Sequence, residues 1–164
     1  MTLLRERRQL IFATAAWCGA CAMAADQTPA GPAPADDAAQ TFRALRPLRG
    51  HFDGGAWNND VDRWQGRKHV AMQHLADQAL RDHASAALLR QWMGEPDATL
   101  QPGHAAHARA IEMAQWLPMV SRAPPADAKI GVLVVYRWRG QHDQLALVLE
   151  HDRVVAAGWL YERE

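Results

Sequence analysis

A short helix with both ends marked is predicted by the stretch Ser85-Ala86-Ala87-Leu88-Leu89-Arg90-Gln91-Trp92-Met93-Gly94-Glu95-Pro96. Ser85 is a favoured N-cap, because its hydroxyl can accept a hydrogen bond from a free N–H of the first turn. The Leu88-Leu89 and Trp92-Met93 pairs recur at helical spacing and give the helix a broad apolar face. Gly94 is the residue type expected just beyond the last turn, and Pro96 prevents the helix from continuing.

Three strands are predicted after residue 131, working outward from this helix. Alternation places Val132, Val134, Tyr136 and Trp138 on one face of the first strand, and Leu145 to Leu149 alternate in the second. The third strand is Arg153 to Tyr161, where Gly158 indicates a bulge or a close approach by another segment. The loops between the strands, including the His151-Asp152 turn, are short, so neighbouring strands pair antiparallel.

Helical periodicity also appears before and between these elements. One helix is predicted from an N-cap at Asn59 through to Ala79, and another over Ala105 to Leu117. Phe42 and Leu45 are expected to dock on the domain. The fold class is therefore α+β, with two or three helices packed on a three-stranded antiparallel β-meander in a single domain over residues 48–164.

Residues 1–24 have the pattern of a signal peptide. A basic start containing Arg7 and Arg8 precedes an apolar segment that is short for a membrane span. Small residues at Ala22 and Ala24 match a signal-peptidase site, so cleavage after Ala24 is predicted. Two alternatives remain open: Arg7-Arg8 as part of a twin-arginine signal, and lipidation of Cys21.

Export to the periplasm, or to the periplasmic face of the outer membrane if Cys21 is lipidated, follows from this leader. Both cysteines lie within it, so the mature chain would have no disulfide or thiolate chemistry. Residues 25–47 are rich in Pro and Ala and are predicted to form a flexible tether. The formal net charge is zero, which gives no support to nucleic-acid binding.

The helix motif and the strands that follow it resemble the SmpA/OmlA family, which includes a small lipoprotein of the outer-membrane β-barrel assembly machinery. The family pattern of a Ser/Thr cap, an aliphatic residue, an apolar pair and Gly-x-Pro is similar to Ser85, Leu89, Trp92-Met93 and Gly94-Glu95-Pro96. The aromatic Tyr136-Arg137-Trp138 strand is also similar. The resemblance covers residues 85–97 and 130–161 and implies a related fold and a place in outer-membrane assembly or maintenance.

No catalytic, cofactor-binding or metal-binding residue is predicted. Ser85 is explained as a helix cap. His104 and His107 lie one helical turn apart, but no third ligand accompanies them in a known zinc pattern. The oxygen-bearing run from Asn58 to Asp62 lacks the glycine and glutamate of a calcium loop, and helix capping explains it.

The sequence therefore predicts a non-enzymatic module that binds another envelope protein. The expected contacts are Tyr136, Arg137 and Trp138, on a sheet face expected to be partly exposed, and Trp57 in a turn-rich loop. The alternatives are an inhibitor or immunity-type binding protein and a small envelope hydrolase or metal binder.

Overall fold

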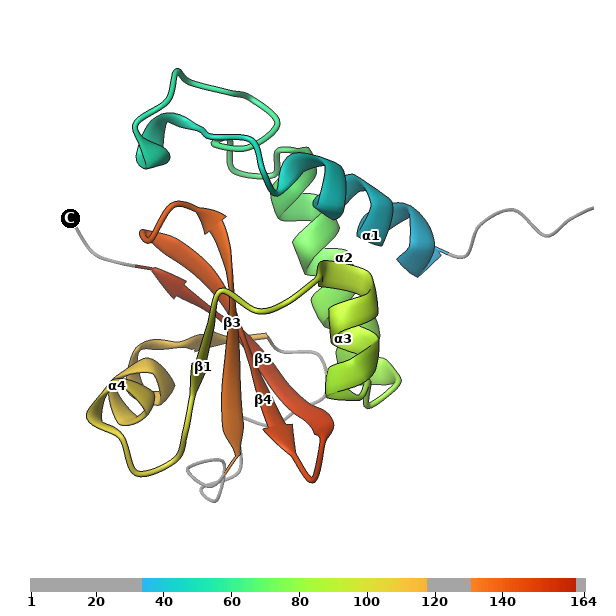
Figure 1. The fold of residues 1–164 in the computed structure, drawn as a ribbon, viewed down its shortest axis with the longest axis vertical. Coiled ribbons are helices and arrows are strands. Elements are labelled where there is room, and N and C mark those ends of the chain that lie inside the picture. The colour runs from blue at the N-terminus through green and yellow to red at the C-terminus, as the bar shows by residue number, and fades with distance from the viewer. Residues whose placement is uncertain (1–33, 118–130, 162–164) are drawn as a thin grey trace, which may run out of the picture. The chain divides into compact units, whose positions relative to one another are not determined.

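The computed structural model describes residues 34–117 and 131–161, which contain four α-helices and a five-stranded antiparallel sheet (Figure 1). The helices are α1 (Pro34–Leu45), α2 (Arg67–Arg81), α3 (Ala86–Met93) and α4 (Ala105–Met113), and η1 (His51–Asp53) is a short 3-10 helix. The strands are β1 (Ala98–Leu100), β2 (Gln115–Trp116), β3 (Val132–Arg139), β4 (Asp143–Glu150) and β5 (Arg153–Tyr161). The α+β class is confirmed.

The predicted meander forms the centre of the sheet, whose strand order is β1-β3-β4-β5-β2. The prediction of three strands was wrong, because β1 and β2 extend the sheet on either side. They contain three and two residues, too few for an alternating pattern to be recognised in the sequence. The close approach predicted at Gly158 is made by β2: a Cβ at Gly158 would lie 2.9 Å from the carbonyl oxygen of Gln115.

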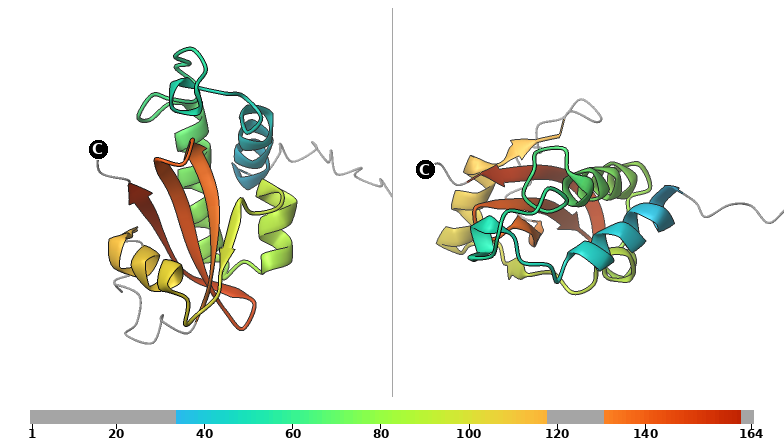
Figure 2. Two further views of the ribbon diagram at one scale, coloured as in Figure 1. Left: turned by 60° about the vertical axis from the view of Figure 1, so that its left-hand side comes forward. Right: turned by 90° about the horizontal axis from the view of Figure 1, so that it is seen from above.

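Both faces of the sheet are covered (Figure 2). The face of Val134, Tyr136 and Trp138 packs against α1, α2 and α3 in the larger apolar cluster. The opposite face, which includes Leu133 and Val135, packs against Ala110 and Ile111 of α4. The alternation predicted for β3 is thus confirmed, and the segment between α3 and β3 supplies the cover for the second face.

The predicted ends of α3 are confirmed. The Ser85 hydroxyl accepts a hydrogen bond from the N–H of Leu88 at 3.2 Å. Gly94 has φ of 77°, a left-handed backbone that favours glycine, and its N–H donates to the carbonyl of Arg90. The buried Tyr136 hydroxyl then donates to the Gly94 carbonyl at 3.1 Å, which joins the end of α3 to β3.

Two sequence predictions about the N-terminal part were wrong. Residues 34–45 of the predicted tether form α1, which is held by the buried side chains of Phe42 and Leu45, as expected for those two residues. Helix α2 begins at Arg67 after an N-cap at Gly66, later than the predicted cap at Asn59. The intervening polar residues form a hydrogen-bonded loop instead of a first helical turn.

Arg46, directly after α1, binds the C-terminal end of α3. Its guanidinium donates to the carbonyl oxygens of Met93 and Glu95, and to the Asp97 carboxylate at 3.0 Å. These carbonyls lie at a helix C-terminus, where a cation is favoured because the last backbone oxygens lack helical partners. Asp97 also accepts from the N–H of Arg137 at 2.8 Å, so the Arg46–Asp97 pair connects α1, α3 and β3.

We expect Arg46→Met to lower the free energy of unfolding by on the order of 2 kcal/mol, because several charge-assisted hydrogen bonds are lost together. Arg43→Met is the matched control: Arg43 makes one exposed hydrogen bond, to the Gln91 carbonyl. Urea denaturation of both variants measures the difference. Equal losses in the two variants would contradict the role given to Arg46.

Candidate functional site

The candidate site is built on a loop over residues 50–66, named here the tryptophan loop because it carries Trp57 and Trp64. Asp62 organises it from inside: this carboxylate is fully buried and accepts from the backbone N–H groups of His51 at 3.0 Å and Asn58 at 2.7 Å. The Asn58 side chain in turn accepts from the N–H of Asp60. Short polar side chains thus satisfy backbone groups that no regular element satisfies.

Two side chains of β3 bind the tryptophan loop. The indole N–H of Trp138 donates to the Val61 carbonyl at 2.7 Å. The Arg139 guanidinium donates to the Asp62 carbonyl at 3.0 Å and lies 4.2 Å from the Trp138 ring and 4.7 Å from the Phe52 ring. Cation–π contacts of this kind add to the hydrogen bonds, so the loop has a defined conformation.

Trp64 covers a buried histidine next to the loop. The His69 ring lies 4.4 Å from Trp64, 4.5 Å from Trp138 and 4.8 Å from Trp159, which it stacks on. Neither nitrogen of His69 has a hydrogen-bond partner among the described residues. Burial, with a further contribution from the Arg139 charge, lowers the pKa of His69 to about 4, so its imidazole is neutral at pH 7.

Large apolar side chains are exposed on and beside the tryptophan loop. Trp57 is 55% exposed and Trp64 is 52% exposed. Leu48, just before the loop, and Val70, in α2, are also exposed. Trp57 is oriented by a hydrogen bond from its indole N–H to the Asn59 side chain at 2.9 Å. Ordered tryptophans in contact with solvent are typical of binding surfaces.

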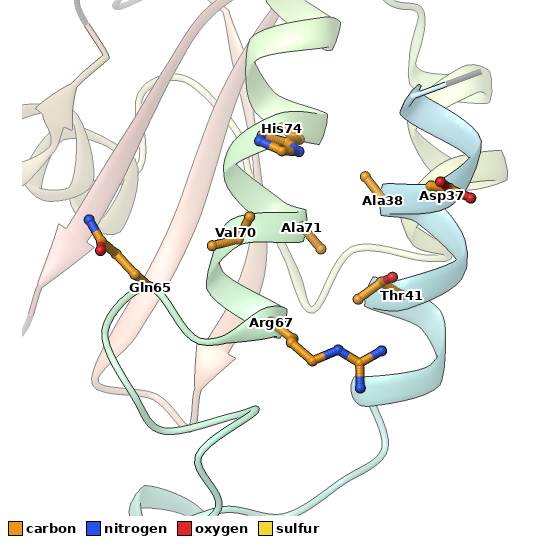
Figure 3. A pocket seen from close by; sticks show the side chains of 8 residues that line it. All are labelled: Asp37, Ala38, Thr41, Gln65, Arg67, Val70, Ala71 and His74. Atoms are coloured by element: carbon orange, nitrogen blue, oxygen red, sulfur yellow. The ribbon is translucent and has the colours of Figure 1, made fainter. Parts of the chain in front are cut away.

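A groove between α1 and α2 begins where the tryptophan loop ends (Figure 3). Its volume is about 540 Å³, and Gln65, which follows Trp64, is one of its lining residues. Val70, Ala71 and Ala38 supply an apolar lining. The polar side chains around it are Asp37 and Thr41 from α1, and Arg67 and His74 from α2. The groove therefore has an apolar lining with polar side chains around it, and Gln65 brings the end of the tryptophan loop to it.

The structure separates the predicted contact residues. Trp57 and Arg137 are exposed, as a contact residue must be. Tyr136 is 1% exposed and Trp138 is 0% exposed, so the expectation that their sheet face is open to solvent was wrong. The helices α1, α2 and α3 cover that face, and Trp138 supports the tryptophan loop from beneath. Cys21 and the predicted cleavage site lie outside the described residues.

Sequence reasoning missed the parts played by Trp64, His69 and Asp62. The predicted helix from Asn59 to Ala79 includes all three residues, so none of them was expected in a loop or in a separate cluster. The cluster of Asn58, Asn59 and Asp60 beside a glycine-rich turn was the signal available, because such residues favour Asx turns over a helix.

The histidines and acids do not gather into a metal site in the part of the chain that the structure describes. His107 is buried, and its Nε2 lies 2.8 Å from the Gly131 carbonyl oxygen, which favours the tautomer with the proton on Nε2. His104 is exposed at the start of α4. Within residues 34–117 and 131–161, no helix has the length and apolar character required to cross a membrane.

Comparison with protein-family models, curated proteins and solved structures finds no match to this chain. The similarity to the SmpA/OmlA family therefore rests on the helix motif and the strand pattern of the sequence and stays a prediction.

We expect stability to fall in acid because of His69. Its pKa is about 4 in the folded chain against an ordinary 6.5, so the unfolded chain takes up more protons between these values. The contribution is complete above about pH 6.5, is lost as the pH falls towards 4, and amounts to on the order of 3 kcal/mol. Urea denaturation at a series of pH values measures it.

His69→Phe keeps an aromatic ring between Trp64, Trp138 and Trp159 and removes the titrating group. The loss of stability in acid should therefore become smaller. His74→Gln is the control, because His74 is exposed on the same helix. If the His69→Phe protein loses stability in acid as steeply as the wild type, the assignment to His69 is incorrect.

Proposed function

We propose that this chain is an exported cell-envelope protein that binds another envelope protein without catalysing a reaction. The tryptophan loop is its docking surface, continued by the groove between α1 and α2. The observation that carries the proposal is the pair of exposed tryptophans on a loop that is held by hydrogen bonds to Asp62 and from Trp138. Tryptophan is among the residues that most often dominate binding energy at protein interfaces.

The rigidity of the loop supports binding as much as its composition does. An interface loses affinity when side chains and loops must be ordered on association. Here Asp62 orders the loop from inside, and Trp138 and Arg139 fix it to β3 before any partner arrives. The entropy loss on docking is correspondingly small.

The polar groups around the groove support a protein as the partner. Arg67 and Asp37 bring opposite charges to one apolar depression, a mixture that suits the varied side chains of a protein surface. Of the contact residues predicted from sequence, Trp57 is part of this surface. Arg137 is exposed on β3 and remains a second candidate contact.

The proposed location rests on the leader, with its basic start, its short apolar segment and the small residues at Ala22 and Ala24. A place in outer-membrane assembly or maintenance is the finer proposal, and the similarity of the helix motif to the SmpA/OmlA pattern supports it. Lipidation at Cys21 would attach the docking surface to a membrane.

Site-specific crosslinking in cells tests the docking surface. A photoreactive phenylalanine analogue at position 57 is expected to crosslink one partner protein reproducibly. The same analogue at position 113 is the control, because Met113 is also exposed but belongs to α4 on the opposite face of the sheet. Trp64→Ala should reduce the crosslink from position 57 by about tenfold or more, in the range of an interface hot spot.

Each variant is first checked by thermal unfolding, so that a lost crosslink is not caused by a lost fold. The same crosslinks from positions 57 and 113, or none from position 57, would refute the docking surface.

The mass of the N-terminal peptide of the protein purified from cells tests the location. We expect a chain that begins at Ala25, or at a lipid-modified Cys21 if the alternative holds. An intact N-terminus on protein recovered from the cytoplasm would contradict export while leaving the docking surface to be judged by the crosslinks.

A further inference from the structure

A second groove lies away from the tryptophan loop, between α3 and the sheet. It has a volume of about 590 Å³. Its floor is apolar: Val132 and Leu149 face each other across β3 and β4, and Val134 continues the floor along β3. Ala86 and Arg90, one turn apart on α3, line the side of the groove.

Carboxylates stand at both ends of this groove. Glu95 lies two residues beyond the C-terminal end of α3, and Glu150 and Asp152 lie at the turn between β4 and β5. That turn is beside the N-terminal end of α3, because Ser85 and Arg153 form a β-bridge. Helix α3, which runs from the one acidic end towards the other, has eight residues and is about 12 Å long at 1.5 Å per residue.

These carboxylates have little internal compensation. Glu150 and Asp152 form no ion pair with any residue that the structure describes, and Glu95 reaches only Arg90, at 3.9 Å. Among the described residues that line the groove, Arg90 is the one Lys or Arg. The groove therefore combines an apolar middle with negative charge at each end.

The dimensions define the ligand that complements this pattern. In an extended chain alternate side chains point the same way, and each residue advances about 3.3 Å. Residues four apart are then separated by about 13 Å, close to the length of α3. A cation at each end and an aliphatic side chain midway would reach both acidic ends and the apolar floor together.

We propose that this groove binds an extended basic segment of a partner protein, with Arg or Lys at the first and fifth positions and an aliphatic residue at the third. Charge complementarity selects the segment, and Val132, Val134 and Leu149 receive its central side chain. This site is separate from the tryptophan loop and does not depend on the function proposed for that loop.

Fluorescence anisotropy with the full chain and a labelled peptide tests this site. The probe is Gly-Arg-Ser-Leu-Ser-Arg-Gly, which is expected to bind saturably. The double variant Glu150→Gln, Asp152→Asn should weaken binding about fivefold, the effect of losing one or two surface ion pairs. Asn tolerates the positive φ of 63° at position 152, so the turn is retained.

The control is the double variant Asp36→Asn, Glu112→Gln, which makes the same change of charge at exposed residues of α1 and α4. It should bind the probe as the wild type does. A peptide with both arginines replaced by glutamate should not bind, and replacing its leucine with serine should weaken binding. No saturable binding, equal weakening in both double variants, or binding of the glutamate peptide would overturn the proposal.

Discussion

The arginine that follows the first helix holds the structure together at one point. Arg46 supplies hydrogen-bond donors to the unpaired carbonyls at the end of α3 and to Asp97, and Asp97 accepts from the backbone of β3. Both charged side chains are about three-quarters buried, with 26% and 23% exposed, so their attraction is screened less than that of a surface pair. The position of α1 on the other two helices, and of all three on the sheet, depends on this contact together with the burial of Phe42.

The tryptophan loop departs from the usual arrangement in which apolar side chains are buried and polar side chains are exposed. Trp57 and Trp64 are exposed, whereas the Asp62 carboxylate is fully buried and the His69 imidazole nearly so. One carboxylate oxygen of Asp62 and both nitrogens of His69 have no partner among the described residues. Buried polar groups without partners cost stability, and apolar groups in water gain none. Departures of this kind are expected where function constrains the sequence.

The sequence predicted what local chemistry controls. Ser85 and Gly94 mark the ends of α3 without help from the rest of the fold, and the alternation in Val132 to Trp138 gives the two faces of β3. It did not predict what depends on distant contacts. Residues 98–100 and 115–116 form strands only because they pair with the edges of β3 and β5. Helix α1 is stable because Phe42 is buried in the larger apolar cluster. Trp138 was predicted to be exposed. The alternation in β3 shows which residues share a face of the sheet, but it does not show which helices cover that face.

The lengths of the outer strands affect whether the sheet of one molecule can pair with the sheet of another. The three central strands have eight or nine residues, and an edge of that length with free backbone groups would be a template for another polypeptide. In the described part of the chain the two outermost strands have only three and two residues. Edges this short offer few hydrogen bonds to a neighbouring molecule. Beyond them, the Arg137 N–H of β3 is bonded to the Asp97 side chain and the Val154 N–H of β5 to the Ala84 carbonyl, which limits pairing of the sheet with a second copy.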